Sequence, residues 1–298
     1  MNKVSIVIVN YNGLEHNEEC INSIINSSYE NIEIIIVDNQ STDGSVERIE
    51  KLFSGRVIVI KNEENSGFAG GTNIGISYAM NHECDYVLLL NNDTIIDKYM
   101  ISCMVESSKK NDGCVISPKI YYYEPNNTIW SAGGEIKWNR GYTIQYGMNE
   151  IDNGQCDEGK KVTFATGCCM LIPRRIIQDI GLIAEDYFLY FEDTDYCVKI
   201  QDRGYCIYYE PKACMFHKVS ATTGGIESET FIYYFSRNRL YFNKKYNKNK
   251  FYNIYIYLSW GKMCLNWIVS GKFNLILTLR RAIKDYKSKL KILSNKSI

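Results

Sequence analysis

Four runs of apolar residues recur along the first hundred residues, and each is followed by a polar stretch that can form a helix. The runs are rich in β-branched residues, and continuous apolar runs of this length are typical of strands buried on both faces of a sheet. Strands that alternate with helices form parallel α/β sheets. The pattern predicts strands at 4–9, 32–37, 57–60 and 86–90, and helices at about 15–27, 43–53, 71–81 and 97–110.

The pattern loosens beyond residue 112. Short strands are predicted in "ISPKIYYY" and "GYTIQYG", which are separated by turns rich in Asn and Gly. A strand and a helix that starts after a proline follow in "FATGCCMLIPRRII", and "FEDTDYCVKIQDRG" predicts a helix with an acidic first turn and a glycine stop. From about residue 229 onward the pattern is helical. The chain is therefore of the α/β class, with a doubly wound sheet and a helical C-terminal region.

Composition narrows the class of protein. The chain has 298 residues, enough for one large domain with an appendage, and 45% hydrophobic content supports a sizeable core. Its 34 basic and 34 acidic residues cancel, which argues against nucleic acid as a partner. The eleven cysteines are scattered through apolar runs such as "GCCMLIP". We expect them to be reduced core thiols in a cytosolic protein, and the start of the chain shows no secretion signal.

The run "FYNIYIYLSWGKMCLNWIV" at 251–269 is the stretch most similar to a membrane segment. Two Asn, a Gly and a Lys interrupt it, so a packed or interfacial helix is favoured over a membrane-spanning one. The flanking sequence mixes Tyr with Lys and Arg. Two interpretations stay open: a helical region that lies on an anionic membrane, or a subdomain whose tyrosines pack on the catalytic domain.

Doubly wound sheets commonly bind nucleotides beyond the carboxyl ends of their strands. "NYNGLEHNEE" after the first strand has one glycine, which fails the dinucleotide fingerprint, and no Gly-Lys-Ser/Thr closes a phosphate loop. What remains is Asp38 at the end of the second strand and the glycine-rich "NSGFAGGTNIG". Asp38 can accept hydrogen bonds from a base or a ribose, and glycines let the backbone approach a ligand. The alternative is that both features only build turns.

Carboxylates at three further positions suggest catalysis with a metal. Asp93 follows the strand "YVLLL" directly, and a strand-end carboxylate can hold a divalent ion if a diphosphate completes the ligand set. Glu192 and Asp193 begin a helix after aromatic residues that are typical of a strand, where desolvation favours a general base. His217 ends another apolar strand. Each also has a purely structural explanation. Asp93 could belong to a turn, and His217 could be a core histidine with its hydrogen bonds satisfied. Glu192, Asp193 and Asp195 could simply form the acidic first turn of a helix, although three carboxylates so close together repel one another.

Six motifs in order resemble those of the family 2 inverting glycosyltransferases, in particular the rhamnosyltransferase-like branch. They are "SIVIVNYNG", "IIIVDNQSTDGS", "NSGFAGGTNIG", "LLLNNDTIID", "TGCCMLIPR" and "YFLYFEDTDYCVKIQDRGY", and the match covers about residues 3–220. The resemblance implies a GT-A fold and a nucleotide-diphospho-sugar transferase that depends on Mn²⁺ or Mg²⁺. It also implies inversion by a single in-line displacement.

The resemblance implies site roles residue by residue. Asp193 is expected to be the catalytic base, and Asp93 and His217 the metal ligands. Gly167, Cys168 and Glu192 are expected at the acceptor. The expected donor and nucleotide residues are Asn10, Tyr11, Asp38, Gly67, Phe68, Gly70, Gly71, Asn73, Asn91 and Asn92. Asn91 and Asn92 stand where other members have carboxylates, so we expect modest metal affinity without donor.

The resulting expectation is a GT-A catalytic domain at 1–225, with a nucleotide-binding half at 1–112 and an acceptor-binding half at 113–225, and a helical region at 226–298. It would move a sugar from a UDP- or dTDP-sugar to a glycan or lipid-linked acceptor in bacterial cell-surface polysaccharide synthesis, at the inner face of the plasma membrane. A homo-oligomer is left open. The alternatives are a non-catalytic nucleotide-sugar-binding protein and a sugar nucleotidyltransferase, and the latter lacks a cationic glycine-rich loop after the first strand.

Overall fold

The computed structural model describes residues 1–219, 225, 227–249 and 251–295 and divides them into two compact units. The first unit comprises 1–135, 144–188 and 192–219. The second comprises 136–143, 189–191 and the chain from 220 onward. The second unit therefore includes two short segments that come from the middle of the sequence.

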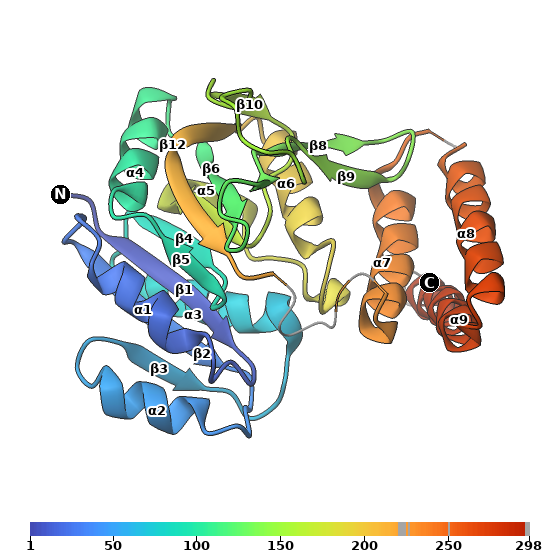
Figure 1. Ribbon diagram of the computed structural model, residues 1–298, viewed down its shortest axis with the longest axis horizontal. Helices are drawn as coiled ribbons and strands as arrows, with labels where there is room; N and C mark the ends of the chain where they lie inside the picture. Colours follow the sequence, from blue (N-terminus) through green and yellow to red (C-terminus); the bar gives the residue numbers. More distant parts are fainter. Residues whose placement is uncertain (220–224, 226, 250, 296–298) are drawn as a thin grey trace. The chain divides into compact units, whose positions relative to one another are not determined.

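A ten-stranded mixed sheet forms the centre of the first unit (Figure 1). Its order is β10-β12-β6-β11-β4-β1-β2-β3, with β5 paired to β12 and β7 paired to β6. The strands β1, β2, β3 and β4 run parallel, whereas β11 runs antiparallel to β4. The bounds are β1 Val4–Asn10, β2 Ile32–Asp38, β3 Ile58–Lys61, β4 Tyr86–Leu90, β5 Thr94–Ile96, β6 Val115–Tyr122, β7 Ile129–Ser131, β10 Lys160–Val162, β11 Cys169–Pro173 and β12 Ile207–His217.

Helices accompany the sheet, and the predicted GT-A arrangement of a doubly wound mixed sheet with a helical C-terminal region is confirmed. Three of the four apolar runs form the inner strands β1, β2 and β4, and every residue of β4 is buried. The fourth run forms the edge strand β3, whose residues are half-buried or exposed. The helices of the first unit are α1 Asn17–Ile25, α2 Ser45–Leu52, α3 Gly67–Asn81, α4 Met100–Lys110, α5 Arg174–Ile180, the short 3₁₀ helix η1 Glu185–Tyr187 and α6 Glu192–Asp202.

Helix α3 begins earlier than predicted, at Gly67 rather than near residue 71, so the glycine-rich stretch forms its first turns. The glycines let this helix pack closely on the sheet. A Cβ on Gly71 would lie 2.9 Å from Val9 Cγ1, and a Cβ on Gly75 would lie 2.3 Å from Val7 Cγ1. Helix–sheet packing thus gives both positions a structural reason to be glycine.

Two cysteines differ from expectation. Cys114 and Cys206 form a disulfide, with Cα atoms 4.9 Å apart, and the expectation that all thiols are reduced is wrong for this pair. The pair lies just before β6 and β12, which are neighbours in the sheet although 92 residues separate the cysteines in sequence. Their proximity follows from strand order, which spacing alone does not reveal. The other nine cysteines are free, and five of them are buried.

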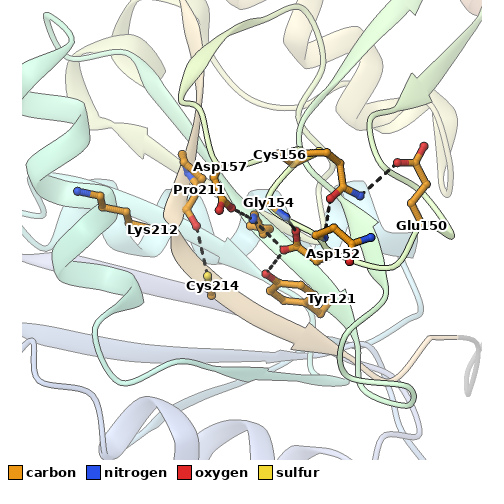
Figure 2. A network of polar contacts seen from close by, with 12 residues as sticks. Tyr121, Glu150, Asp152, Gly154, Cys156, Asp157, Pro211, Lys212 and Cys214 are labelled. Carbon is orange, nitrogen blue, oxygen red and sulfur yellow. Dashed lines mark hydrogen bonds and ion pairs between the residues drawn. The ribbon is translucent and has the colours of Figure 1, made fainter.

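A buried lysine fastens the loop before β10. Lys119 in β6 is 2% exposed, and its Nζ lies 2.9 Å from Asp152 Oδ2 and 2.5 Å from Asp157 Oδ1. Figure 2 shows the Tyr121 hydroxyl directed at Asp152, to which it donates a hydrogen bond of 2.5 Å. Desolvation opposes the charge of Lys119, but the two carboxylates outweigh it and raise the pKa of the ammonium. The lysine is therefore held as a charged anchor.

The second unit is helical, with α7 Glu229–Tyr246, α8 Tyr252–Val269 and α9 Phe273–Asn295, and the β8–β9 hairpin (Gly134–Lys137 and Tyr142–Gln145) extends into it. Ser228 caps α7 by accepting a hydrogen bond from the Phe231 amide. An apolar cluster joins the three helices through Leu240, Trp260 and Leu279. Among the residues that the structure describes, no helix combines the length and the apolar character needed to cross a membrane.

Replacing Gly75 with Ala should destabilise the protein by about 1–3 kcal/mol, because the new methyl group overlaps the buried Val7 side chain. Gly261→Ala in α8 is the matched control, since nothing lies within 4 Å of its Cβ position. Removing a glycine from a helix interior then stabilises by up to about 1 kcal/mol. Urea denaturation measures both free energies of unfolding. Equal stabilisation by the two substitutions would contradict the packing argument.

Replacing Lys119 with Ala should cost about 3–5 kcal/mol, because Asp152 is then left partly buried without its cation. The exposed pair of Lys61 and Glu50 serves as the control, and Lys61→Ala should change the free energy of unfolding far less. Thermal and urea unfolding give both values. A similar small effect for the two lysines would show that the anchor contributes little.

Candidate functional site

The first part of the site lies at the carboxyl ends of β1 and β2. Asn10 and Asp38 face each other in register, and both are buried. Asn10 Nδ2 donates to Asp38 Oδ1 at 2.7 Å, and the Ser41 amide donates to Asp38 Oδ2 at 3.0 Å. The structure thus brings the two expected nucleotide residues together and orients the carboxylate. Both explanations of Asp38 given above, the turn and the ligand contact, remain compatible with this geometry.

The other expected donor residues differ in their surroundings. Tyr11 is 42% exposed next to Asn10. Asn73 is buried and bonds elsewhere in the protein: its Nδ2 donates to the Ile183 carbonyl and to Glu185 Oε1, and its Oδ1 accepts from the Ile183 amide. The amide of Asn73 therefore holds the segment before α6. Its predicted role toward a donor is not visible in these contacts.

The glycine-rich start of α3 is also tied to that segment. Gly67 has a φ of +74°, and a Cβ there would lie 2.4 Å from the Phe188 carbonyl oxygen. The Phe68 amide donates to the same oxygen at 2.8 Å. Gly70 packs on Ser66 in the same turn. Gly67 therefore lets the first turn of α3 lie close to the backbone at Phe188. The chain continues from Phe188 into α6.

Asp93 and His217 meet at the ends of two paired strands. His217 pairs with Thr94 between β12 and β5, which places Asp93 beside the histidine. His217 Nε2 lies 3.1 Å from Asp93 Oδ1, and both side chains are 8% exposed. The contact is an ion pair, and this Oδ1 has no hydrogen-bond partner among the described residues. His217 Nδ1 is also buried and has no hydrogen-bond partner among the described residues.

Electrostatics hold this pair in its charged forms. Burial alone would raise the pKa of Asp93, but the neighbouring His217 lowers it below its usual range. Burial alone would lower the pKa of His217, but Cys168 and Asp93 raise it to about 10. The Cys168 thiol, whose own pKa is raised by burial, lies against the imidazole. We give the carboxylate more weight than the thiol as the cause, because a buried thiol remains neutral near pH 7.

The pair fits a divalent cation, which would take the place of the proton on His217. Two ligands at adjacent corners of an octahedral site around Mg²⁺ lie about 3 Å apart, close to the separation of the two side chains. Asp93 Oδ1 is a buried acceptor in need of a partner. Within the described residues, no group of three or more His, Cys, Asp or Glu side chains is placed to hold a metal.

Asp193 lies at the start of α6 and is partly exposed. Its Oδ2 accepts from the Gly167 amide at 3.0 Å, and its Oδ1 accepts from the amide and hydroxyl of Thr194 at 2.6 and 3.1 Å. Desolvation raises the pKa of the carboxyl, and the hydrogen bonds from Gly167 and Thr194 offset only part of the rise. A carboxylate with a raised pKa is suited to proton abstraction.

Glu192 is the buried neighbour of that carboxyl. It is 5% exposed, and its Oε2 has no hydrogen-bond partner within the described part of the chain. Burial and the charge of Asp193 raise the pKa of Glu192 well above its ordinary value. Asp195, the third carboxylate, accepts from the Tyr187 hydroxyl at 2.9 Å. The three carboxyls at this helix start are thus separated into different environments.

The approach to α6 is a turn, although the aromatic residues before it suggested a strand. Phe188, Tyr190 and Phe191 have φ values of 66°, 65° and 74°. Positive φ is rare for bulky residues and costs of order 1–3 kcal/mol each. Within the second unit, Asn238 Nδ2 donates to the carbonyls of Leu189 and Tyr190, each at 2.8 Å. The sequence signal misled because aromatic residues favour strands in general.

Two consecutive residues connect the two carboxylate sites. The Gly167 amide bonds to Asp193, and the Cys168 thiol lies against His217, which faces Asp93. The Cys168 carbonyl accepts from the Asn91 amide at 2.9 Å. Asp93 and Asp193 are therefore both linked to this two-residue segment, Asp193 directly and Asp93 through His217. The Asn92 side chain donates to Asn17 Oδ1 at 3.1 Å.

Three residues near the site were missed from the sequence. Asn39 is 1% exposed and donates to the Gly67 carbonyl. Lys218 follows His217 and forms an ion pair with Glu19. His16 lowers the pKa of Asp93, and its effect is smaller than those of burial and of His217. His16 Nδ1 is buried and has no hydrogen-bond partner among the described residues. Asn39 and Lys218 adjoin predicted residues, and this position was a usable signal. His16 had no such signal, since it lies in a polar stretch outside the quoted motifs.

Comparison with known proteins identifies the family. The model of "Glycosyl transferase family 2" matches residues 5–181, which is more than half of the chain. The chain belongs to glycosyl transferase family 2. The predicted family is confirmed, and the matched range contains every expected site residue except Glu192, Asp193 and His217. The family 2 chain is thus an enzyme of the glycosyltransferase class.

Individual relatives are moderately similar to this family 2 chain. It is 26% identical over 284 residues to the low-salt glycan biosynthesis hexosyltransferase Agl10 of Haloferax volcanii, covering 93% of the chain and 88% of the relative. It is 29% identical over 229 residues to a poly-beta-1,6-N-acetyl-D-glucosamine synthase of Staphylococcus aureus, covering 75% of the chain and 52% of the relative. The chain thus spans about half the length of that synthase.

Solved structures share the fold at low identity. GalNAc-T7 with UDP, GalNAc and Mn²⁺ has a TM-score of 0.67 at 18% identity, covering 86% of this chain and half (50%) of the other. The mannosyltransferase PcManGT of Pyrobaculum calidifontis, with GDP-Man and Mn²⁺, has a TM-score of 0.58 at 13% identity. The match covers 99% of this chain and 79% of the mannosyltransferase. These similarities support the GT-A fold.

The raised pKa of Glu192 makes folding stability depend on pH. The folded state binds this proton more tightly than the unfolded state, so the stabilisation is full below the ordinary glutamate pKa and is lost as pH rises toward the folded value. Glu192→Gln removes this dependence. We therefore expect the stability of the variant, relative to wild type, to rise in urea denaturation as pH increases from about 4 into the neutral range. A constant difference across this range would contradict a raised pKa.

Proposed function

We propose that the chain is an inverting, metal-dependent hexosyl- or rhamnosyltransferase that moves a sugar from a UDP- or dTDP-sugar to a hydroxyl of a glycan or lipid-linked acceptor. Its setting would be cell-surface polysaccharide synthesis in bacteria, at the inner face of the plasma membrane. The names of the relatives, a glycan hexosyltransferase and a polysaccharide synthase, support this class of acceptor. In the same proposal, residues 1–112 bind the nucleotide and residues 113–225 the acceptor.

One observation supports the reaction most directly. The segment Gly167–Cys168 contacts a partly exposed carboxyl of raised pKa on one side and the Asp93–His217 pair on the other. An inverting transferase needs a base on one face of the donor sugar and charge neutralisation for the leaving diphosphate on the opposite face. Both groups are present within one short stretch of structure. A protein that only binds a nucleotide-sugar has no need of the base.

The residues suggest a single displacement. Asp193 accepts the proton of an acceptor hydroxyl, the oxygen of which forms a bond to the anomeric carbon as the bond to the nucleoside diphosphate breaks. The Gly167 amide keeps Asp193 Oδ2 in place, and Thr194 holds Oδ1. Asp93 and His217 would hold Mn²⁺ or Mg²⁺. The bound ion would supply positive charge to the diphosphate.

Asp193→Asn should lower transfer or donor hydrolysis by roughly 10²–10⁴-fold while nucleotide binding stays nearly intact, because only the proton acceptor is removed. Asp202→Asn, an exposed carboxylate on the same helix, is the matched control and should keep full activity. The acid limb of the wild-type pH profile of kcat/KM should lie above the ordinary aspartate pKa, since the pKa of Asp193 is raised.

A separate binding measurement tests the other half of the site. Titration calorimetry with UDP and dTDP, with and without Mn²⁺, should show metal-dependent binding that Asp93→Asn weakens and Asp193→Asn does not. Unchanged turnover in Asp193→Asn would remove the assigned base and leave a binding protein or another chemistry. Binding independent of both metal and Asp93 would remove the metal pair.

A further inference from the structure

Helix α8 has an outer face that is apolar and exposed. Leu258, Leu265 and Val269 are 70%, 65% and 90% exposed, and Ile254 is 57% exposed. The four positions follow the spacing of one helical face, at i, i+4, i+11 and i+15 from Ile254. Such a row of large exposed aliphatic side chains is uncommon on a protein surface that meets only water.

The opposite face of the same helix packs into the second unit. Ile256, Trp260 and Trp267 are buried in the cluster that α8 shares with α7 and α9. Helix α8 is therefore apolar on both sides, although only one side is covered within the described structure. A helix that is apolar all round is normally buried all round. We therefore expect the exposed face of α8 to be covered by a binding partner.

Two further exposed apolar residues lie at the start of α9, just after the turn at 270–272. Phe273 is 58% exposed and Leu277 is 63% exposed. We call the set of exposed apolar residues on both helices the hairpin face. Its members are Ile254, Leu258, Leu265, Val269, Phe273 and Leu277.

Basic residues extend the hairpin face along α9. Arg280 and Lys284 lie seven and eleven positions after Phe273, hence on the same side of the helix, and both are exposed. Lys272 forms an ion pair with Glu227 at the turn. Between residues 251 and 288 the only acidic residue is Asp285, and it accepts a hydrogen bond from Tyr233. The basic residues of this stretch are Lys262, Lys272, Arg280, Arg281, Lys284 and Lys287.

Charge decides between two occupants. A second copy of the chain docked by the same face would bring the basic groups of both copies together, and this repulsion disfavours a two-fold pair. An anionic bilayer attracts the same groups and accepts the apolar side chains below its headgroups. We propose that the hairpin face is a membrane-docking surface that lies in the interface of an anionic bilayer. The proposal does not depend on the reaction assigned to the first unit.

Flotation of the purified full-length chain with vesicles tests the proposal. Binding should be strong for phosphatidylcholine mixed with phosphatidylglycerol, weaker for pure phosphatidylcholine, and reduced by salt because the basic residues contribute. No flotation with the anionic vesicles would overturn the proposal. Transfer to a soluble acceptor analogue, measured in parallel, reports on the reaction independently of this outcome.

Substitutions on the hairpin face locate the binding. Leu265→Gln and Val269→Gln should each lower the vesicle partition coefficient about tenfold, since each removes an aliphatic side chain from the bilayer. Leu52→Gln, an equally polar change at an exposed leucine of α2, is the matched control and should bind as wild type. Arg280→Gln with Lys284→Gln should lower binding to anionic vesicles and flatten its salt dependence. Circular dichroism checks that all variants keep the wild-type fold.

Two outcomes would replace the bilayer with another explanation. If Leu265→Gln and Leu52→Gln bind vesicles equally, the hairpin face is not the docking surface. If sedimentation velocity shows a wild-type dimer that Leu265→Gln dissociates, and neither protein floats with vesicles, a second copy of the chain covers the face instead.

Discussion

The hydrogen bond from the Asn91 amide to the Cys168 carbonyl is the contact on which the site depends. It extends the antiparallel pairing of β4 and β11 past the ends of both strands. On one side of it the chain continues to Asp93, and on the other it leads back to Gly167. The two halves of the proposed chemistry lie close together because β11 runs antiparallel to β4, whereas β1, β2, β3 and β4 run parallel to one another. If β11 ran parallel to β4, its first residue would lie at the opposite edge of the sheet, away from Asp93.

Buried charge is concentrated in this region, and it is not arranged for stability. Asp93 Oδ1 and Glu192 Oε2 are buried oxygens without hydrogen-bond partners among described residues. Each such group costs about 1–3 kcal/mol relative to a satisfied one. By contrast, the buried Lys119 has two carboxylate partners. Unsatisfied groups of this kind are usually retained at functional sites, where a substrate completes their contacts.

The parallel strands and the order of the motifs could be predicted, because β-branched runs and strand-end polar residues are local signals. The pairing of Asp93 with His217 came only from family resemblance, and the structure explains it by the contact of β5 with β12, which lie more than a hundred residues apart. The start of α3 was placed too late because glycine is a poor helix former, and only the nearness of Val7 and Val9 shows why it is needed there. The Cys114–Cys206 disulfide and the strained turn at Tyr190 depend on tertiary contacts, so no local pattern could reveal them.

The segment Gly167–Cys168 has a mechanical consequence. Its backbone amide fixes one carboxylate and its thiol supports the imidazole that faces the other, so a displacement of this short segment moves both ends together. Kinetic effects of substitutions at the two ends would then be correlated rather than independent. In a double-mutant cycle, the effects of substituting Asp93 and Asp193 would depart from additivity, although no direct contact joins the two carboxylates among the described residues.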